Sequence, residues 1–199
     1  MKKIKVSDFI CHLKMVDHHV IKDRILSEIS KTFGDTIPQN NSYYCDRVSK
    51  LDWSCANDWN REWVKILLPN FYLTAKKFLK ECAYKELELV KMWYQQYQKG
   101  DQHGWHIHGD HYTGVYYLEY PKSAAKTQIC SPYNLRSQKI EGVEEGDMII
   151  FPAHWIHRGL KNGKDRKTIV SYNFSINADS LLDTKLVGSV NNKKPYIIF

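Results

Sequence analysis

Residues 103–111 read His103-Gly-Trp-His-Ile-His-Gly-Asp-His111, and residues 151–157 read Phe151-Pro-Ala-His-Trp-Ile-His157. Six of the nine histidines of the chain lie in these two stretches. Two histidines one residue apart, followed by a distant third, are typical of a metal site built on a sheet, because imidazole nitrogen is a common metal ligand. The two stretches therefore predict a metal site that is surrounded by β-structure.

The spacing of the first stretch allows two sets of ligands. In a strand, residues i and i+2 point to the same side about 7 Å apart, so His106 and His108 can face one cavity, and so can His108 and Asp110. His157 from a distant strand would close one face of an octahedron and leave positions for other groups, as in the facial triad of non-haem iron oxygenases. The ligand set is then either His106, His108 and His157, or His108, Asp110 and His157. We interpret the other three histidines of the two stretches as ordinary surface or core residues: His103, His111 and His154.

The pattern of apolar residues predicts helices first and strands afterwards. Apolar residues recur near helical spacing at Ile21, Ile25, Ile29 and Phe33, before a possible helix stop at Gly34. A second helix is expected where Phe71, Ala75, Phe78, Leu79 and Cys82 share one face, and residues 38–60 are polar and irregular. Strands are expected over residues 90–97, 112–120, 148–151 and 168–176. The expected fold class is α+β with a mainly β core, a jelly roll with N-terminal helices packed on one face.

Composition and length narrow the class of protein. The chain has 199 residues, of which 43% are hydrophobic and 13% aromatic, enough for a single domain with a proper core. No apolar run approaches the roughly 18 residues of a membrane helix, and the N-terminal residues do not form a signal peptide. Five scattered cysteines indicate reduced thiols in the cytoplasm. The net charge of +7 is dispersed, so a nucleic-acid partner is not favoured.

An ordered set of motifs extends the pattern on both sides of the histidines. Tyr97-Gln-Lys-Gly100 precedes His106, Thr113-Gly-Val-Tyr-Tyr-Leu118 follows it, and Gly146-Asp-Met-Ile-Ile-Phe-Pro152 leads to His157 and then to Arg166. With this set, residues 90–177 resemble the Fe(II)/2-oxoglutarate-dependent dioxygenases, particularly the prolyl-4-hydroxylase-like branch and its short phage and microbial relatives. The resemblance implies a double-stranded β-helix core over residues 89–177, helical support over residues 1–88 and a C-terminal extension over residues 178–199.

The resemblance also implies the cofactors and the reaction. Iron(II) would lie at the mouth of the core with 2-oxoglutarate bound inside, and O2 would be consumed as an unactivated C–H bond of peptidyl proline or of a small molecule is hydroxylated, with release of succinate and CO2. The contacts to the 2-oxoglutarate tail would fall on Arg166 and Tyr117, with Tyr97 as a further candidate. Motif counting places the first ligand at His106 and puts His108 where the family usually has a carboxylate. Aromatic residues near the cavity are interpreted mainly as core: Phe151, Trp155 and Tyr116.

Two other functions agree with the same histidines. One is a cupin-like dioxygenase that has a three-histidine metal site and does not use 2-oxoglutarate. The other is a jelly-roll binding module without catalytic activity, in which the histidines hold a structural metal. An Arg166 side chain that points into the cavity would favour 2-oxoglutarate, whereas a site closed by four protein ligands would favour the binding module, because catalysis needs open positions.

Overall fold

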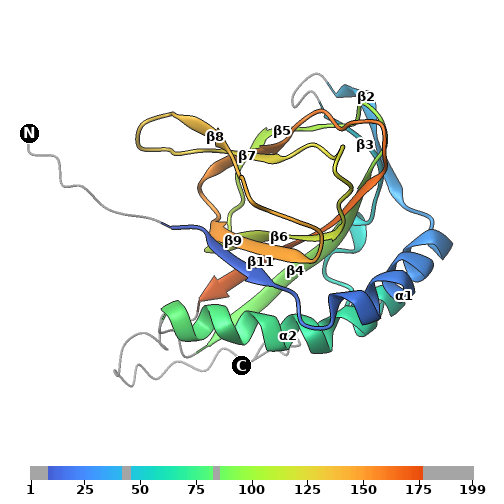
Figure 1. The fold of residues 1–199 in the computed structure, drawn as a ribbon, viewed down its shortest axis with the longest axis horizontal. Helices are drawn as coiled ribbons and strands as arrows, with labels where there is room; N and C mark the ends of the chain where they lie inside the picture. The colour runs from blue at the N-terminus through green and yellow to red at the C-terminus, as the bar shows by residue number, and fades with distance from the viewer. Residues whose placement is uncertain (1–8, 42–45, 83–85, 177–199) are drawn as a thin grey trace, which may run out of the picture.

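Two antiparallel sheets and two helices make up the computed structural model, which describes residues 9–41, 46–82 and 86–176 (Figure 1). The elements follow one another as β1 (Cys11–Lys14), α1 (His18–Lys31), β2 (Asp35–Asn41), β3 (Asp46–Leu51), the 3-10 helix η1 (Trp53–Cys55), α2 (Glu62–Cys82), β4 (Leu87–Tyr97), β5 (His103–His106), β6 (Tyr112–Glu119), β7 (Thr127–Cys130), β8 (Ser137–Lys139), β9 (Asp147–Pro152), β10 (Ile156–Gly159) and β11 (Lys167–Ile176). Within the described residues, the larger sheet has the order β1-β9-β6-β11-β4-β3-β2 and the smaller sheet the order β5-β10-β7-β8.

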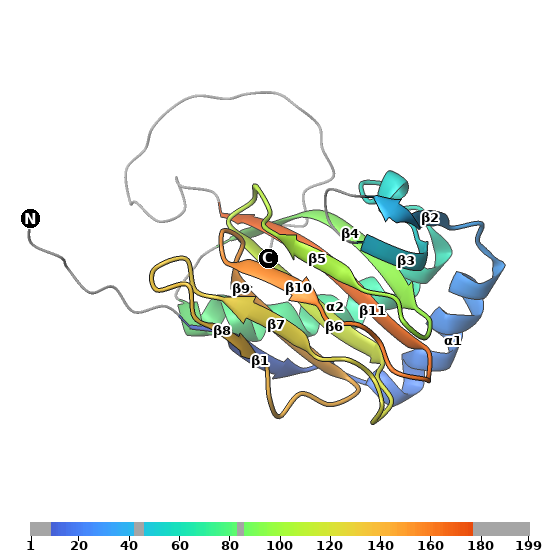
Figure 2. The same ribbon diagram turned by 90° about the horizontal axis from the view of Figure 1, so that it is seen from above.

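The two sheets face each other and the helices lie on the outer face of the larger sheet. Figure 1 shows α1 and α2 along one side of the larger sheet and the strands of the smaller sheet along the other side. Figure 2, seen from above, shows β5, β10 and β7 lying in front of the strands of the larger sheet and running in a similar direction. This arrangement confirms the predicted mainly β core with N-terminal helices on one face. No helix in the described part of the chain is long and apolar enough to cross a membrane.

The two expected helices form, with shifted ends. Ile21, Ile25 and Ile29 are buried on one face of α1, as their spacing predicts. Phe33 lies beyond the end of this helix and is fully exposed, so it does not extend the apolar face. The second helix, α2, begins at Glu62, well before the first residue of the expected apolar face at Phe71.

The first third of the chain also supplies three strands, which the sequence did not predict. β1 pairs with β9, β3 pairs with β4, and β2 pairs with β3 at the edge of the larger sheet. The stretch 38–60 looked irregular because β3 pairs with β4, a strand much later in the chain, and local periodicity does not record such a pairing. The expected C-terminal extension, residues 178–199, lies outside the described residues.

Strand β11 separates two hydrophobic clusters by the alternation of its side chains. It lies between β4 and β6 and pairs with both in antiparallel register. Val170, Tyr172 and Phe174 belong to the cluster that contains the residues of both helices. Ile169 belongs to the second cluster, which includes Ile129 of the smaller sheet and therefore fills the space between the sheets. Odd-numbered residues of β11 thus face the space in which a ligand can bind.

A close approach of three strands requires glycine at position 114. The Tyr172 hydroxyl donates a hydrogen bond to the carbonyl oxygen of Ile149 at 2.8 Å. A Cβ atom at Gly114 would overlap with both of these oxygen atoms, and a backbone carbonyl cannot move aside cheaply.

We expect Gly114→Ala to lower the free energy of unfolding by about 1–3 kcal/mol, the usual cost of overpacking a core. Gly109→Ala is the matched control, because nothing lies within 4 Å of a Cβ atom at that position, and it should change the free energy by less than about 0.5 kcal/mol. Urea unfolding followed by circular dichroism measures both values. Equal stability of the two variants would contradict the proposed close packing.

Candidate metal centre

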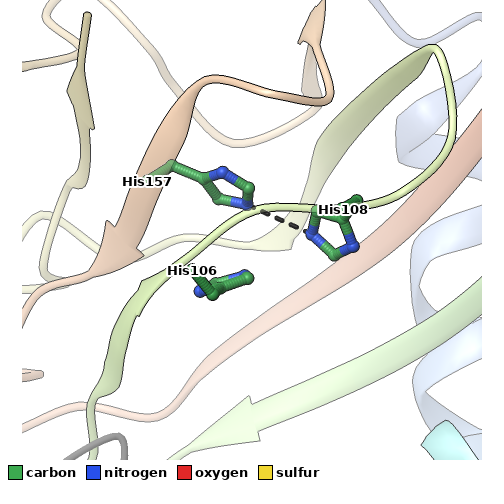
Figure 3. Close-up of side chains that lie close together, drawn as sticks. All are labelled: His106, His108 and His157. Carbon is green, nitrogen blue, oxygen red and sulfur yellow. Dashed lines mark hydrogen bonds between the residues drawn. The ribbon is translucent and has the colours of Figure 1, made fainter. Parts of the chain in front are cut away.

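Three histidines from different segments point toward one another. His106 ends β5, His108 follows it in the loop, and His157 lies in β10 (Figure 3). The antiparallel pairing of β10 with β5 places His157 directly opposite His106. One ring nitrogen from each of the three lies within 4.8 Å of the others, and the Nε2 atoms of His108 and His157 are 3.2 Å apart. Two nitrogens bound to one ion at right angles, each at 2.0–2.1 Å, would be separated by about 3 Å, so this spacing fits a metal ion.

Backbone carbonyls orient two of these rings. The Nδ1 atom of His106 lies 2.8 Å from the Gly104 oxygen, and Nδ1 of His157 lies 2.9 Å from the Trp155 oxygen. A carbonyl only accepts, so each Nδ1 carries the proton and each Nε2 keeps its lone pair. This arrangement leaves the nitrogens that face the common centre free to bind a metal.

All three histidines are held in the neutral form. Burial lowers the pKa of His108 to about 3, with smaller contributions from His106 and Lys91. Burial likewise lowers the pKa of His106 and, more strongly, that of His157. Neutral imidazole is the form that binds metals, so no proton has to leave before an ion is bound at neutral pH.

Asp110 does not join this group. Its Oδ2 atom accepts a hydrogen bond from Nδ2 of Asn173 at 2.5 Å, and the metal-ligand group found among the described residues consists of the three histidines alone. The spacing argument for the set with Asp110 assumed a continuous strand, but β5 ends at His106 and the chain turns before β6 begins. The structure therefore assembles His106, His108 and His157, and not the alternative with Asp110.

The other histidines of the two stretches have different surroundings. The ring of His103 stacks on that of His106, with centroids 4.0 Å apart. The His111 Nδ1 atom accepts a hydrogen bond from the backbone of Ile176 at 3.1 Å. His154 is exposed and lies next to Tyr133. None of the three contributes a ligand atom to the group, although His103 lies in contact with it.

A buried lysine lines the cavity behind the histidines. Lys167 is 2% exposed and lines this inner cavity together with His103, His106, His108 and His157. Its Nζ atom donates to the Ala125 carbonyl at 3.2 Å and lies 4.2 Å from the centroid of the Tyr97 ring. No described carboxylate forms an ion pair with it, and burial lowers its pKa to about 7. Sequence reasoning missed Lys167, which is marked only by its odd-numbered place at the start of β11.

Arg166 points away from the cavity. Its Nε and Nη2 atoms donate to the two carboxylate oxygens of Glu119 at 2.8 and 2.9 Å, and 43% of its side chain is exposed. Thr168 donates to the same carboxylate at 2.7 Å, so residues 166 and 168 share one side of the strand and Lys167 takes the other. The prediction from the motif order placed Arg166 at the cosubstrate, but the side-chain alternation of β11 puts Lys167 and not Arg166 in the lining of the inner cavity.

The two predicted tyrosines are both buried near the inner cavity. Tyr97 lines it beneath Lys167. The Tyr117 hydroxyl lies 2.8 Å from that of Thr127, which also lines the cavity. Other polar residues lining the cavity that the sequence did not single out are Gln95 and Ser171.

The three aromatic residues that were interpreted mainly as core belong to the hydrophobic clusters. Phe151 and Trp155 contribute to the cluster between the sheets, and Tyr116 to the cluster on the helix side. The ring of Phe151 also meets that of His157 edge-on, with centroids 5.0 Å apart. Phe151 therefore supports the ring of one histidine of the group.

Comparison with known proteins found similar solved structures, but no protein-family model and no curated protein matches the chain. A prolyl-4-hydroxylase from Pseudomonas putida is similar in structure, with a TM-score of 0.61 and 11% identity over 86% of this chain and 94% of the other. A prolyl hydroxylase from Trichoplax adhaerens, solved with a peptide fragment of hypoxia inducible factor, has a TM-score of 0.59 and 15% identity over 88% and 87% of the two chains.

A third similar structure is that of an epimerase and not of a hydroxylase. The α-ketoglutarate-dependent epimerase SnoN from nogalamycin biosynthesis has a TM-score of 0.64 and 12% identity over 94% of this chain and 89% of the other. The histidine group lines a cavity between the two antiparallel sheets, and the similar structures include prolyl hydroxylases and this epimerase. The chain therefore has the double-stranded β-helix fold of the Fe(II)/2-oxoglutarate oxygenases.

Proposed function

We propose that the protein is an Fe(II)- and 2-oxoglutarate-dependent oxygenase that hydroxylates an unactivated C–H bond. The observation that carries the proposal is the pairing of three neutral, converging histidines with a buried lysine in the cavity behind them. The fold and the ordered motifs around His106 and His157 support the same function. We infer a cytoplasmic location from the cysteines, four of which are described and free.

The histidines fit an iron ion by their donor chemistry. His106, His108 and His157 would hold it through three neutral nitrogens, and no fourth ligand among the described residues closes the site. Bound iron(II) would supply the reaction with dioxygen that 2-oxoglutarate drives by its decarboxylation to succinate and CO2. The protein's part is to hold the ion, to orient the cosubstrate and to exclude water.

Lys167 fits the far carboxylate of 2-oxoglutarate. A buried cation without a carboxylate partner is costly, and an anionic ligand would offset that cost. The inner cavity measures about 30 Å³, room for about one water molecule. Cosubstrate binding therefore requires side chains of the lining to move, and we propose that Lys167 leaves the face of the Tyr97 ring, which would widen the cavity and bring the ammonium group to the ligand.

The same observations weigh against the two alternative functions. A three-histidine dioxygenase that does not use 2-oxoglutarate has no need of a buried cation in the cavity, and Lys167 provides one. A structural metal site would be closed by a fourth protein ligand, which the described residues do not supply. The substrate is a small molecule or a peptide, and peptidyl proline is one candidate, since a similar prolyl hydroxylase was solved with a peptide.

Removal of one histidine of the group should weaken iron binding strongly. We expect anaerobic addition of Fe(II) and 2-oxoglutarate to the wild-type protein to produce a weak visible charge-transfer band. His157→Ala should weaken Fe(II) binding at least about a hundredfold, since loss of an outer-shell partner alone costs 10–100-fold. His154→Ala, which removes an exposed histidine outside the group, is the matched control. A wild-type protein without the band, together with unchanged iron binding by His157→Ala, would rule out the proposal.

Lys167 and Arg166 can be distinguished by a pair of equivalent substitutions. Lys167→Met should weaken 2-oxoglutarate binding by roughly 10- to 100-fold, because it removes a charge-assisted hydrogen bond worth about 1.5–3 kcal/mol. Arg166→Met should leave this affinity within about twofold, because the Arg166 side chain binds Glu119 at the surface. Calorimetric titration of the iron-loaded protein without oxygen measures both affinities. The reverse order of effects would restore the original assignment to Arg166.

Binding of 2-oxoglutarate should be linked to proton uptake by Lys167. The pKa of Lys167 is about 7 in the ligand-free protein, and a carboxylate beside the ammonium group would raise it. Above pH 7 the ligand therefore binds together with a proton, close to one per ligand at about pH 8.5 and close to none at about pH 6, and its affinity falls as pH rises. Calorimetry in buffers of different ionisation enthalpy counts the protons, and equal uptake at both pH values would refute the linkage.

The lowered pKa of Lys167 also has a consequence for stability. The unfolded chain retains the ordinary lysine pKa of 10.5, so between about pH 7 and 10.5 it binds more protons at this position than the folded chain. The contribution of Lys167 to the stability of the ligand-free protein consequently increases with pH over this window. Comparison of urea unfolding of the wild type and Lys167→Met at several pH values isolates this contribution, which should vanish in the variant.

A further inference from the structure

A second cavity opens on the outer side of the histidine group. It has a volume of about 370 Å³ and is lined by residues of β3, η1 and β4 and by His103, His106 and His108. Trp93, Gln95 and the same three histidines also line the inner cavity, so these residues separate the two spaces. We propose that this outer cavity is the substrate site and that it receives a neutral, apolar group of the substrate. The proposal rests on the function proposed above and deepens it.

Two tryptophans form the main walls of the outer cavity. Trp93 is 2% exposed, and its ring lies 5.7 Å from that of His108. Trp53 meets Trp93 edge to face with centroids 4.5 Å apart, a favoured aromatic geometry. Leu51 and Ile107 complete the apolar lining. A substrate group packed against these walls would lie directly beside two of the candidate metal ligands.

The position of Trp53 is fixed by hydrogen bonds of the residues around it. Asp52, the preceding residue, accepts hydrogen bonds from the Tyr94 backbone at 2.8 Å and from Nε1 of Trp63 at 3.0 Å, and it forms an ion pair with Arg61 at 2.5 Å. The Ser54 backbone, on the other side, donates to Asp35 at 3.2 Å. The wall is thus held in place before any substrate arrives, which lowers the entropic cost of binding.

Charge in the lining excludes several classes of substrate. Among the described residues, the lining contains no lysine or arginine, and its one carboxylate is that of Asp35 at the exposed rim. Lys91 is nearby, but its Nζ atom lies 5.1 Å from the centroid of the Trp53 ring and is not part of the lining. A phosphate or carboxylate of a nucleotide or acidic metabolite would find no cationic side chain among these lining residues. Apolar walls with few polar groups and a volume of 300–1,000 Å³ are typical of sites for small organic groups.

The rim of the cavity allows the apolar group to belong to a larger molecule. Trp53 is 44% exposed and Ile107 is 58% exposed, so apolar surface continues from the cavity to the outside. A small molecule and an aliphatic or prolyl side chain of a peptide present the same chemistry to the two tryptophans. The cavity therefore selects the group to be hydroxylated by its lack of charge, and the remainder of the substrate extends past the rim.

A matched pair of probes tests the selection against charge. N-acetyl-leucinamide and N-acetyl-leucine have the same apolar group and differ by one negative charge. We expect the iron- and 2-oxoglutarate-loaded protein, kept without oxygen, to bind the amide about tenfold more tightly than the acid, as measured by ligand-observed NMR and tryptophan fluorescence. Equal binding, or tighter binding of the acid, would overturn the proposal. N-acetyl-prolinamide and a short peptide with a central proline, measured in the same way, compare the two sources of the apolar group, and tighter binding of the peptide would assign the peptide source.

Substitutions of the walls test the location of the site. Trp53→Ala should weaken binding of N-acetyl-leucinamide about tenfold, because it removes much of the apolar contact area. Phe33→Ala is its control, as Phe33 is an exposed aromatic residue outside the lining. Ile107→Asp should abolish binding of the amide, whereas Leu73→Asp, at a comparably exposed position on α2, should leave it unchanged. Unchanged binding in both wall variants would overturn the proposal.

Binding of 2-oxoglutarate separates failure of this inference from failure of the proposed function. Trp53→Ala should still bind the cosubstrate with wild-type affinity, which also shows that the variant is folded. If the wild-type protein binds iron and 2-oxoglutarate but none of the neutral probes, the outer cavity is not the substrate site and the proposed function stands. If it binds neither cosubstrate nor probe, both proposals fail together.

Discussion

The alternation of side chains along β11 is the constraint on which the rest of the structure depends. The strand is paired on both sides, with β4 and with β6, over almost its whole length. A shift of one residue would move Val170 and Tyr172 out of the helix-side core and would expose that face of the sheet. The same register decides that Lys167 faces the inner cavity and that Arg166 faces the surface. Core packing and the place of Lys167 in the inner cavity are therefore two results of one strand register.

Much of the fold could be predicted from the sequence because it depends on local periodicity. The long helices and the long central strands have regular apolar patterns, and both kinds of element form where they were expected. The strands β1, β3, β7, β8 and β10 are short and owe their formation to partners elsewhere in the chain. Their local sequence has too few residues to show a period, and so they were not recognised.

The site could be predicted in its residue types but not in its side-chain directions. The histidine spacing included the three residues that converge. His106 and His108 are separated by one residue, and His157 lies on β10, the strand that pairs with β5. The place of Asp110 depended on where β5 ends, which the sequence does not record. The place of Arg166 depended on the phase of β11, and two adjacent basic residues, Arg166 and Lys167, made both phases compatible with the motif.

The histidine group is oriented in large part by main-chain atoms. The oxygens of Gly104 and Trp155 set the tautomers of His106 and His157, and each belongs to the residue two positions earlier in the chain. Any residue at positions 104 and 155 would present the same carbonyl oxygen, so evolution can replace these side chains without altering the direction of the rings. A centre oriented in this way places few demands on the surrounding sequence.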